Sequence, residues 1–145
     1  MKIIIQRVNK AKVTVEEKLI SEIGPGILVL LGIKKGDTES QLKQLAQRCV
    51  NLRIFEDNNG KSNLSLCDIK GEALVVSQFT LLADTSRGRR PSFTDAEEPE
   101  KAKRLYELFI SILNHLGTPT KGGVFGERMI VSLENNGPVT IIMEA

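Results

Sequence analysis

The chain has 145 residues, of which 41% are hydrophobic and 26% charged, the size and composition of one ordinary globular domain. Its longest apolar run, residues 27–33, is far shorter than the ~20 residues of a membrane span, and charges at Lys2 and Arg7 come too early for a signal peptide. The net charge of +2 is too small to indicate a nucleic-acid binder by itself.

Strands are expected throughout the first part of the chain. Val13 and Val15 alternate with polar residues, as in a strand with one buried face. Residues 27–33 are continuously apolar, which predicts a strand buried on both faces, and Gly24-Pro25-Gly26 predicts a turn before it. The four expected strands are 2–8, 12–16, 19–23 and 27–33.

Two segments have the apolar spacing of amphipathic helices. In the first, Asp37 and Thr38 are both good N-caps. In the second, Pro99 suits the first turn and Gly117 suits the end. The two apolar stripes are Leu42, Leu45, Ala46, Cys49 and Val50, and Ala102, Leu105, Tyr106, Phe109, Ile112, Leu113 and Leu116.

The rest of the chain contains further predicted strands and one long loop. Asn59-Gly60 is typical of a hairpin turn after a strand at 52–55, and residues 85–99 lack an apolar period, which favours a functional loop. Residues 135–138 are expected to join the last two strands. The other expected strands are 72–82, 128–133 and 139–143. This order predicts a single α/β domain over residues 1–145, of mixed α+β character, with a mixed, strongly curved sheet.

Few residues are available for nucleophilic or metal chemistry. The one histidine, His115, is expected to be partly exposed at the end of the second helix, so a serine–histidine catalytic arrangement is not expected. Cys49 lies on the first apolar stripe, which favours inert core packing, and Cys67 is expected to be half-buried rather than reactive. We see no zinc or redox motif, and expect no metal, no cofactor and a reduced, cytoplasmic compartment.

Residues 77–81, Ser-Gln-Phe-Thr-Leu, form an unusual polar insertion after a buried run. Polar side chains at the end of a buried strand must find partners or line a cavity. In a regular strand Ser77 and Thr80 point to opposite faces, so presenting both hydroxyls together would need a bulge. The alternative is that both hydroxyls bond to local backbone groups.

Two polar loops each allow more than one interpretation. The cluster Arg87-Gly88-Arg89-Arg90 either contacts phosphate groups or pairs with the acidic run at 95–100. Phe93 is the only aromatic residue nearby, so a base-stacking platform is not favoured. Residues 135–140, Asn-Asn-Gly-Pro-Val-Thr, are typical of a hairpin turn, and the isomer of the proline peptide stays open.

Segments 77–81 and 135–140 together resemble the two signature motifs of the D-aminoacyl-tRNA deacylase family, also called D-tyrosyl-tRNA deacylases. Neither segment departs from the family pattern. The similarity extends along essentially the whole chain. It includes Gln6-Arg7-Val8, Asn51 to Phe55, and the loop from Ala83 to Phe93.

The resemblance implies a fold, an activity and partners. Family members are curved, barrel-like sheets with helices packed outside. They are cytoplasmic homodimers that hydrolyse the ester joining a D-amino acid to the 3′ end of tRNA, and they also clear glycine mischarged on alanine tRNA. Gly137 and Pro138, joined by a cis peptide in the family, would reach across the dimer into the other subunit's pocket. Their carbonyls would accept hydrogen bonds from the substrate's amino group, and the motif would exclude an L side chain.

The resemblance also implies catalytic residues, which are Ser77, Gln78, Phe79 and Thr80. Backbone N–H groups around Phe79 and Thr80 would stabilise the oxyanion of an already activated ester. The attacking water would be assisted by the terminal 2′-hydroxyl of the tRNA. Thr80 would either position the substrate or attack it, and the lack of a visible base favours positioning.

Further residues match family positions near the pocket. Arg7 would support the Gly-Pro loop, and Phe125 and Met129 would line the site of the terminal adenosine or amino acid. The tRNA-backbone contacts would come from Arg87, Arg89 and Arg90. From the residues alone, Met129 could equally be core and Arg7 a surface ion pair. Two other functions stay open on the same basis: a non-enzymatic RNA-binding module and a hydrolase of other acyl esters or amides.

Overall fold

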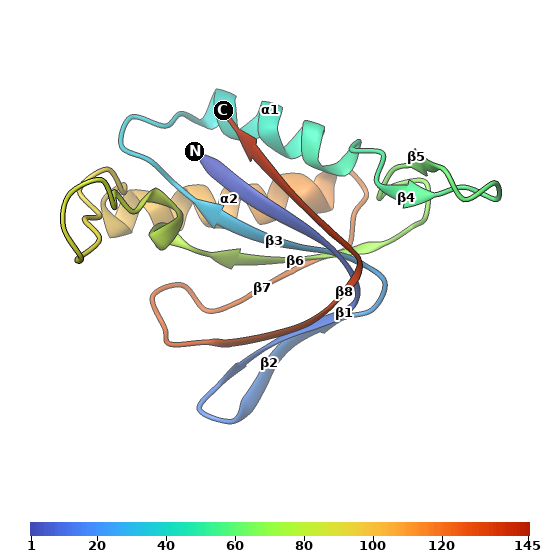
Figure 1. Ribbon diagram of the computed structural model, residues 1–145, viewed down its shortest axis with the longest axis horizontal. Coiled ribbons are helices and arrows are strands. Elements are labelled where there is room, and N and C mark those ends of the chain that lie inside the picture. The colour runs from blue at the N-terminus through green and yellow to red at the C-terminus, as the bar shows by residue number, and fades with distance from the viewer.

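A six-stranded mixed sheet forms the centre of the computed structural model, which describes residues 1–145 (Figure 1). Its strands are β1 (Lys2–Val15), β2 (Lys18–Ile23), β3 (Gly26–Gly32), β6 (Glu72–Ser77), β7 (Thr120–Gly122) and β8 (Ile130–Glu144). The strand order is β2-β1-β3-β6-β7, with β8 also paired to β1. A second, two-stranded sheet consists of β4 (Phe55–Glu56) and β5 (Ser62–Leu64). The helices are α1 (Glu39–Val50), the 3₁₀ helix η1 (Phe79–Leu82) and α2 (Pro99–His115).

The sheet curls because β1 has different partners along its length. Its first half pairs with β3 and its second half with β2, while β8 runs antiparallel along both halves. The result is a nearly closed, barrel-like sheet with α1 and α2 against its outer face (Figure 1). The predicted single α/β domain with a curved mixed sheet and two outer helices is confirmed.

Strand β3 is buried on both faces, as its continuous apolar sequence predicts. Ile27, Val29 and Leu31 belong to the large core between the sheet and the helices. Leu28 belongs to a smaller core inside the curved sheet, where it meets Leu74 of β6. Parallel strands that are covered on both faces are expected to be continuously apolar. Strands β3 and β6 therefore each contribute residues to both cores.

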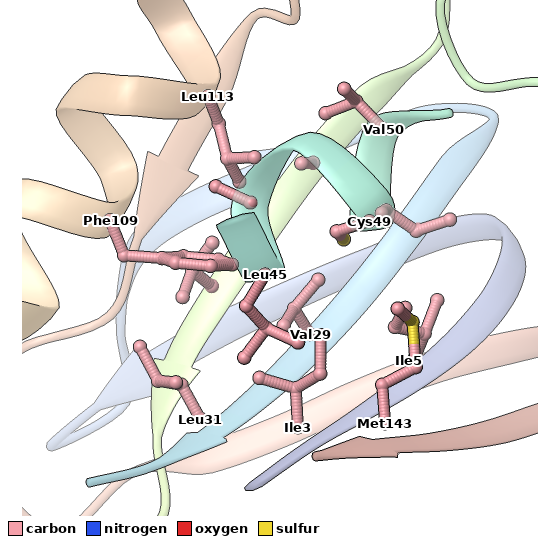
Figure 2. Close-up of a cluster of buried hydrophobic side chains, with 14 of the residues drawn as sticks. Ile3, Ile5, Val29, Leu31, Leu45, Cys49, Val50, Phe109, Leu113 and Met143 are labelled. Atoms are coloured by element: carbon pink, nitrogen blue, oxygen red, sulfur yellow. The ribbon is translucent and has the colours of Figure 1, made fainter. Parts of the chain in front are cut away.

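The outer core is built from the two predicted apolar stripes. Leu45 of α1 and Phe109 and Leu113 of α2 pack with β-strand residues such as Val29 (Figure 2). Cys49 is part of the same cluster, and burial raises the pKa of its thiol to about 12. The thiol therefore stays protonated at neutral pH, as expected for inert core packing.

The helix ends follow their sequence signals with one exception. Thr38 caps α1 in a capping box with Gln41, whereas Asp37 does not cap the helix. The Asp37 carboxylate instead accepts from the Lys34 N–H at 2.6 Å. Pro99 opens α2, and Gly117 follows its end with a φ of +89°, a conformation that glycine adopts without strain.

Several strands differ from their predicted bounds, because pairing with distant segments decides where strands continue. Segments 2–8 and 12–16 are one strand, since the residues between them also pair with β8. Of segment 52–55, only Phe55 joins a strand, although the predicted hairpin turn at Asn59-Gly60 does connect β4 and β5. Strand β7 was not predicted from its polar sequence.

The strand predicted over 72–82 ends at Ser77, and η1 follows. The Gln78 N–H still donates to the Leu31 carbonyl of β3 at 2.8 Å, but the Leu81 N–H donates back to the Gln78 carbonyl at 3.2 Å. Gly32 makes room for this turn, since a β-carbon there would lie 3.1 Å from the Gln78 carbonyl oxygen. The polar insertion is therefore a turn and not a bulged strand.

The predicted hairpin at 135–138 is also wrong. The two predicted strands around it are halves of β8, and both halves pair with β1. Val8 lies opposite Asn135 and Gln6 opposite Thr140, so residues 136–139 bulge out against the single residue Arg7. The peptide between Gly137 and Pro138 inside this bulge is cis. We call residues 136–139 the β8 bulge.

Candidate active site

A pocket of about 470 Å³ opens at the carboxyl ends of the parallel strands β3, β6 and β7. In α/β sheets this edge is where ligands bind. The pocket is lined by Ser77, Gln78 and Phe79 after β6, by Phe125 and Met129 after β7, and by the start of α2. A larger, more open groove of about 740 Å³ between β2 and β7 contains none of the predicted site residues. We therefore take the first pocket as the candidate site.

The polar wall of the pocket is the turn from β6 into η1. The Gln78 carboxamide Nε2 donates a hydrogen bond to the Thr80 Oγ1, which links the two side chains. Thr80 itself is exposed and does not line the pocket. Ser77 and Gln78 are half-buried, and Phe79 is exposed. The turn therefore does not present the hydroxyls of Ser77 and Thr80 to the pocket together. Ser77 lines the pocket, whereas Thr80 lies outside it and accepts a hydrogen bond from the side chain of Gln78.

The part of the lining that carries Phe125 depends on Tyr106, which the sequence indicated only as a core residue of α2. Its hydroxyl donates to the Val75 carbonyl of β6 at 2.9 Å and contacts the Gly123 carbonyl at 3.3 Å. Its ring packs on Phe125, with centroids 5.9 Å apart. Burial raises the pKa of Tyr106 to about 12, so the hydroxyl remains a donor. Tyr106 therefore fixes the wall that carries Phe125.

Glu97 is a pocket-lining carboxylate that the sequence analysis missed. A hydrogen bond from Lys101 at 2.6 Å, supported by the Glu98 N–H, lowers the pKa of Glu97. Asp95, in the same acidic run, pairs with Lys34 at 3.5 Å. No carboxylate of this run forms an ion pair with the arginine cluster, so the predicted pairing between them is wrong.

The three arginines of that cluster are exposed on a loop beside the pocket. None of them takes part in an ion pair. Asp84 and Ser92 close the base of the loop with two backbone hydrogen bonds of 2.8 and 2.9 Å. Phe93 then packs edge-on against Phe79, with centroids 5.1 Å apart, and so ties the loop to η1. The cluster consists of Arg87, Arg89 and Arg90.

Arg7 anchors the β8 bulge from the neighbouring strand. It does form an ion pair with Glu56, at 3.9 Å, but Arg7 is only 8% exposed and is therefore not a surface residue. Its Nε donates to the Asn136 carbonyl at 2.7 Å, and its Nη1 donates to the Ile54 carbonyl. The bulge itself presents Gly137 and Pro138 to solvent.

The bulge and the pocket lie apart within one chain. Arg7 pairs with Ile27, and Ile27 pairs with Ala73, which is four residues before Ser77. Four residues of strand correspond to about 13 Å. The structure therefore brings together Ser77, Gln78, Phe79, Phe125 and Met129, but it does not bring Arg7, Gly137 or Pro138 to the same pocket.

Other candidate groups lie outside the pocket. His115 is exposed at the end of α2, and Cys67 is exposed rather than half-buried. No group of three or more His, Cys, Asp or Glu side chains is placed to hold a metal ion. None of the helices combines the length and apolar character needed to cross a bilayer.

Comparison with known proteins places this arrangement in a family. The chain is 54% identical over 142 residues to the D-aminoacyl-tRNA deacylase of Persephonella marina, covering 98% of this chain and 96% of that protein. It is 53% identical over 146 residues to the D-aminoacyl-tRNA deacylase of Thermosipho melanesiensis, covering 100% and 97%.

Solved structures have the same fold. The structure of a c-Myc DNA Unwinding Element Binding Protein matches with a TM-score of 0.95 at 43% identity, over 100% of this chain and 99% of that one. A probable eukaryotic D-amino acid tRNA deacylase matches with a TM-score of 0.83 at 17% identity, over 98% and 97%. The model of the family described as D-Tyr-tRNA(Tyr) deacylase matches residues 4–144. The chain therefore belongs to the D-Tyr-tRNA(Tyr) deacylase family of hydrolases.

Proposed function

We propose that this protein hydrolyses the ester bond of D-aminoacyl-tRNA, releasing the D-amino acid and free tRNA, and so proofreads the chirality of translation substrates. The observation that carries the proposal is the pocket at the ends of β3, β6 and β7. It holds the motif Ser77-Gln78-Phe79 against Phe125 and Met129, in a chain of the deacylase family.

The proposed chemistry relies on orientation and on backbone donors. An ester is already activated, so positioning and oxyanion stabilisation can supply the rate enhancement without a histidine base. The first N–H groups of a helix have no intrahelical acceptor. Those of Phe79 and Thr80 would therefore be available to the developing oxyanion. The water would be assisted by the 2′-hydroxyl of the terminal ribose, and Thr80 would position rather than attack.

Selectivity for D substrates would come from a second copy of the chain. The β8 bulge lies too far from the pocket of its own chain, which supports a homodimer in which each bulge enters the other subunit's pocket. Main-chain carbonyls of Gly137 and Pro138 would accept hydrogen bonds from the substrate's amino group. The same backbone would exclude an L side chain. Glycyl-tRNA would be accepted as well, because glycine has no side chain to clash.

The remaining residues would bind the rest of the substrate. Phe125 and Met129 would contact the terminal adenosine or the amino acid. Arg7 would hold the bulge through the Asn136 carbonyl. The backbone phosphates of the acceptor end would meet Arg87, Arg89 and Arg90. The expected compartment is the cytoplasm, where aminoacyl-tRNA is found.

The direct test is release of tyrosine from D-tyrosyl-tRNA by the pure protein, with L-tyrosyl-tRNA as the control. We expect fast release from the D substrate alone. Binding of tRNA without release would identify an RNA-binding module instead. Hydrolysis of small esters, with no preference for a tRNA substrate, would indicate a hydrolase of another class.

A further inference from the structure

The carboxamide of Asn135 closes the β8 bulge on one side. Its Oδ1 accepts from the Val139 N–H at 2.7 Å, and its Nδ2 donates to the Val139 carbonyl at 3.1 Å. The same Nδ2 also donates to the Thr140 Oγ1 at 3.1 Å. One side chain thus satisfies both backbone groups of the residue that follows Pro138. Asn135 is half-buried in this position.

These contacts complement the contact made by Arg7. Arg7 holds the carbonyl of Asn136, the residue before Gly137, at 2.7 Å. Asn135 holds both backbone groups of Val139, the residue after Pro138. The dipeptide Gly137-Pro138 is therefore fixed at both of its ends by side chains that do not themselves project from the bulge.

We propose that Asn135 is a positioning residue that sets the place of the Gly137 and Pro138 main chain, and thereby the discrimination between D and L substrates. This inference rests on the proposed function. A selector made of main chain discriminates only as well as its position is fixed, because a shift of about 1 Å can cost a reaction about 100-fold in rate.

The contacts require an amide and not a carboxylate. Aspartate at position 135 could still accept from the Val139 N–H, but its second oxygen would face the Val139 carbonyl and could not donate to it. Asn135→Asp therefore keeps size and shape while replacing one attraction by a repulsion. Thr140 would retain the hydrogen bond from the Gln6 Nε2, at 3.3 Å, as its other side-chain partner.

A matched control exists on the neighbouring strand. Asn9 is exposed, and its Oδ1 accepts from the Asn136 Nδ2 at 3.0 Å. Asn9→Asp adds the same charge beside the same bulge without losing a donor that the bulge uses. The experiment compares rates of deacylation of D-tyrosyl-tRNA and L-tyrosyl-tRNA for the wild type, Asn135→Asp and Asn9→Asp.

We expect Asn135→Asp to lower the ratio of D to L rates by about tenfold, the effect of losing about one partly buried hydrogen bond. Asn9→Asp should stay within about twofold of the wild type, as expected at the surface. An unchanged ratio in a folded Asn135→Asp protein would overturn the proposal, and so would an equal loss in both variants.

A second measurement covers the case in which Asn135→Asp does not fold. Amide hydrogen exchange of the wild type reports whether the Val139 N–H is protected. Slow exchange supports the contact with Asn135, whereas exchange as fast as in an open loop contradicts it. If the wild type shows no hydrolysis of D-tyrosyl-tRNA, the proposed function fails, and the exchange measurement still decides whether Asn135 fixes the bulge.

Discussion

The pocket and the β8 bulge are both polar interruptions of strands in the main sheet, but they are built in opposite ways. At the pocket, β6 simply ends, and the backbone turns into η1 through its own hydrogen bonds. At the bulge, β8 continues on both sides, and side chains from Arg7 and Asn135 hold the extra residues in place. The pocket is thus a consequence of where strands stop, while the bulge is a structure that specific side chains maintain.

The difference indicates a division of work between the two regions. A turn at the carboxyl ends of parallel strands offers backbone N–H groups and a cavity, which suit a reacting ester. The bulge offers exposed main chain with no cavity of its own, which suits contact with something outside this chain. In the proposed mechanism each region supplies what the other lacks, and a complete site would combine one of each.

The largest expected effect is the loss of activity in a bulge variant and in a pocket variant, and its partial recovery when the two variants are mixed. Gly137→Ala and Ser77→Ala should each be nearly inactive alone. If a site combines the bulge of one subunit with the pocket of the other, mixed dimers contain one site free of both changes. Mixing equal amounts, with subunit exchange, should then restore about a quarter of the wild-type activity.

The oligomeric state must be followed in the same experiment, by sedimentation. Dilution to the monomer should abolish turnover of the wild type. No restoration after proven subunit exchange, or full activity of a proven monomer, would mean that the two regions work within one chain.

The next largest effect is expected from backbone changes within the bulge. Gly137 has a φ of +147°, and a β-carbon there would lie 2.7 Å from the Val139 Cγ2 and 2.8 Å from its backbone nitrogen. We expect Gly137→Ala to lower hydrolysis of D-tyrosyl-tRNA by about 100-fold, and Pro138→Ala to lower either that rate or the ratio of D to L rates by a similar factor. Asn136→Ala, which loses only a side-chain contact with Asn9, should have a much smaller effect. If all three variants keep the wild-type rates and the wild-type ratio of D to L rates, the bulge has no role in hydrolysis or in substrate selection.

The two regions also differ in how far the sequence could predict them. The polar run 77–81 stood out because it follows an apolar strand, and its place at a pocket is a local consequence of strand termination. The bulge resembled a hairpin, because local composition does not say whether Asn135 and Thr140 pair with each other or with β1. The helices α1 and α2 were predictable, since a helical stripe is a local pattern.

Long-range contacts explain what the sequence analysis missed. Residues 120–122 form a strand only because Ala73, Leu74 and Val75 pair with them. Tyr106 has the spacing of a core residue, and nothing local indicates that its hydroxyl reaches Val75. Glu97 differs, because its partner Lys101 is only four residues away; what the sequence could not show is that the start of α2 places Glu97 in the pocket lining.

A smaller effect is expected for Thr80, which lies outside the pocket and contacts it through Gln78. If Thr80 only positions that side chain, Thr80→Ala should keep measurable deacylation, lowered by about tenfold. The check is single-turnover deacylation with denaturing capture of any enzyme-linked amino acid. A covalent aminoacyl adduct on Thr80 would make it the nucleophile and contradict the positioning role.

The smallest effect is expected from the arginine loop, which neither region needs for chemistry. Arg89 and Arg90 have no carboxylate partner in the structure, so replacing them breaks no ion pair. If they meet tRNA phosphates, Arg89→Ala or Arg90→Ala should weaken binding several-fold for every tRNA, whatever its amino acid. Each lost phosphate contact should also reduce the slope of log affinity against log salt by about 1. The matched control is Arg104→Ala on α2, where the guanidinium pairs with Glu39 and is not part of the pocket lining. An unchanged salt slope for both loop variants would mean that these arginines stay in solvent and do not contact the tRNA backbone.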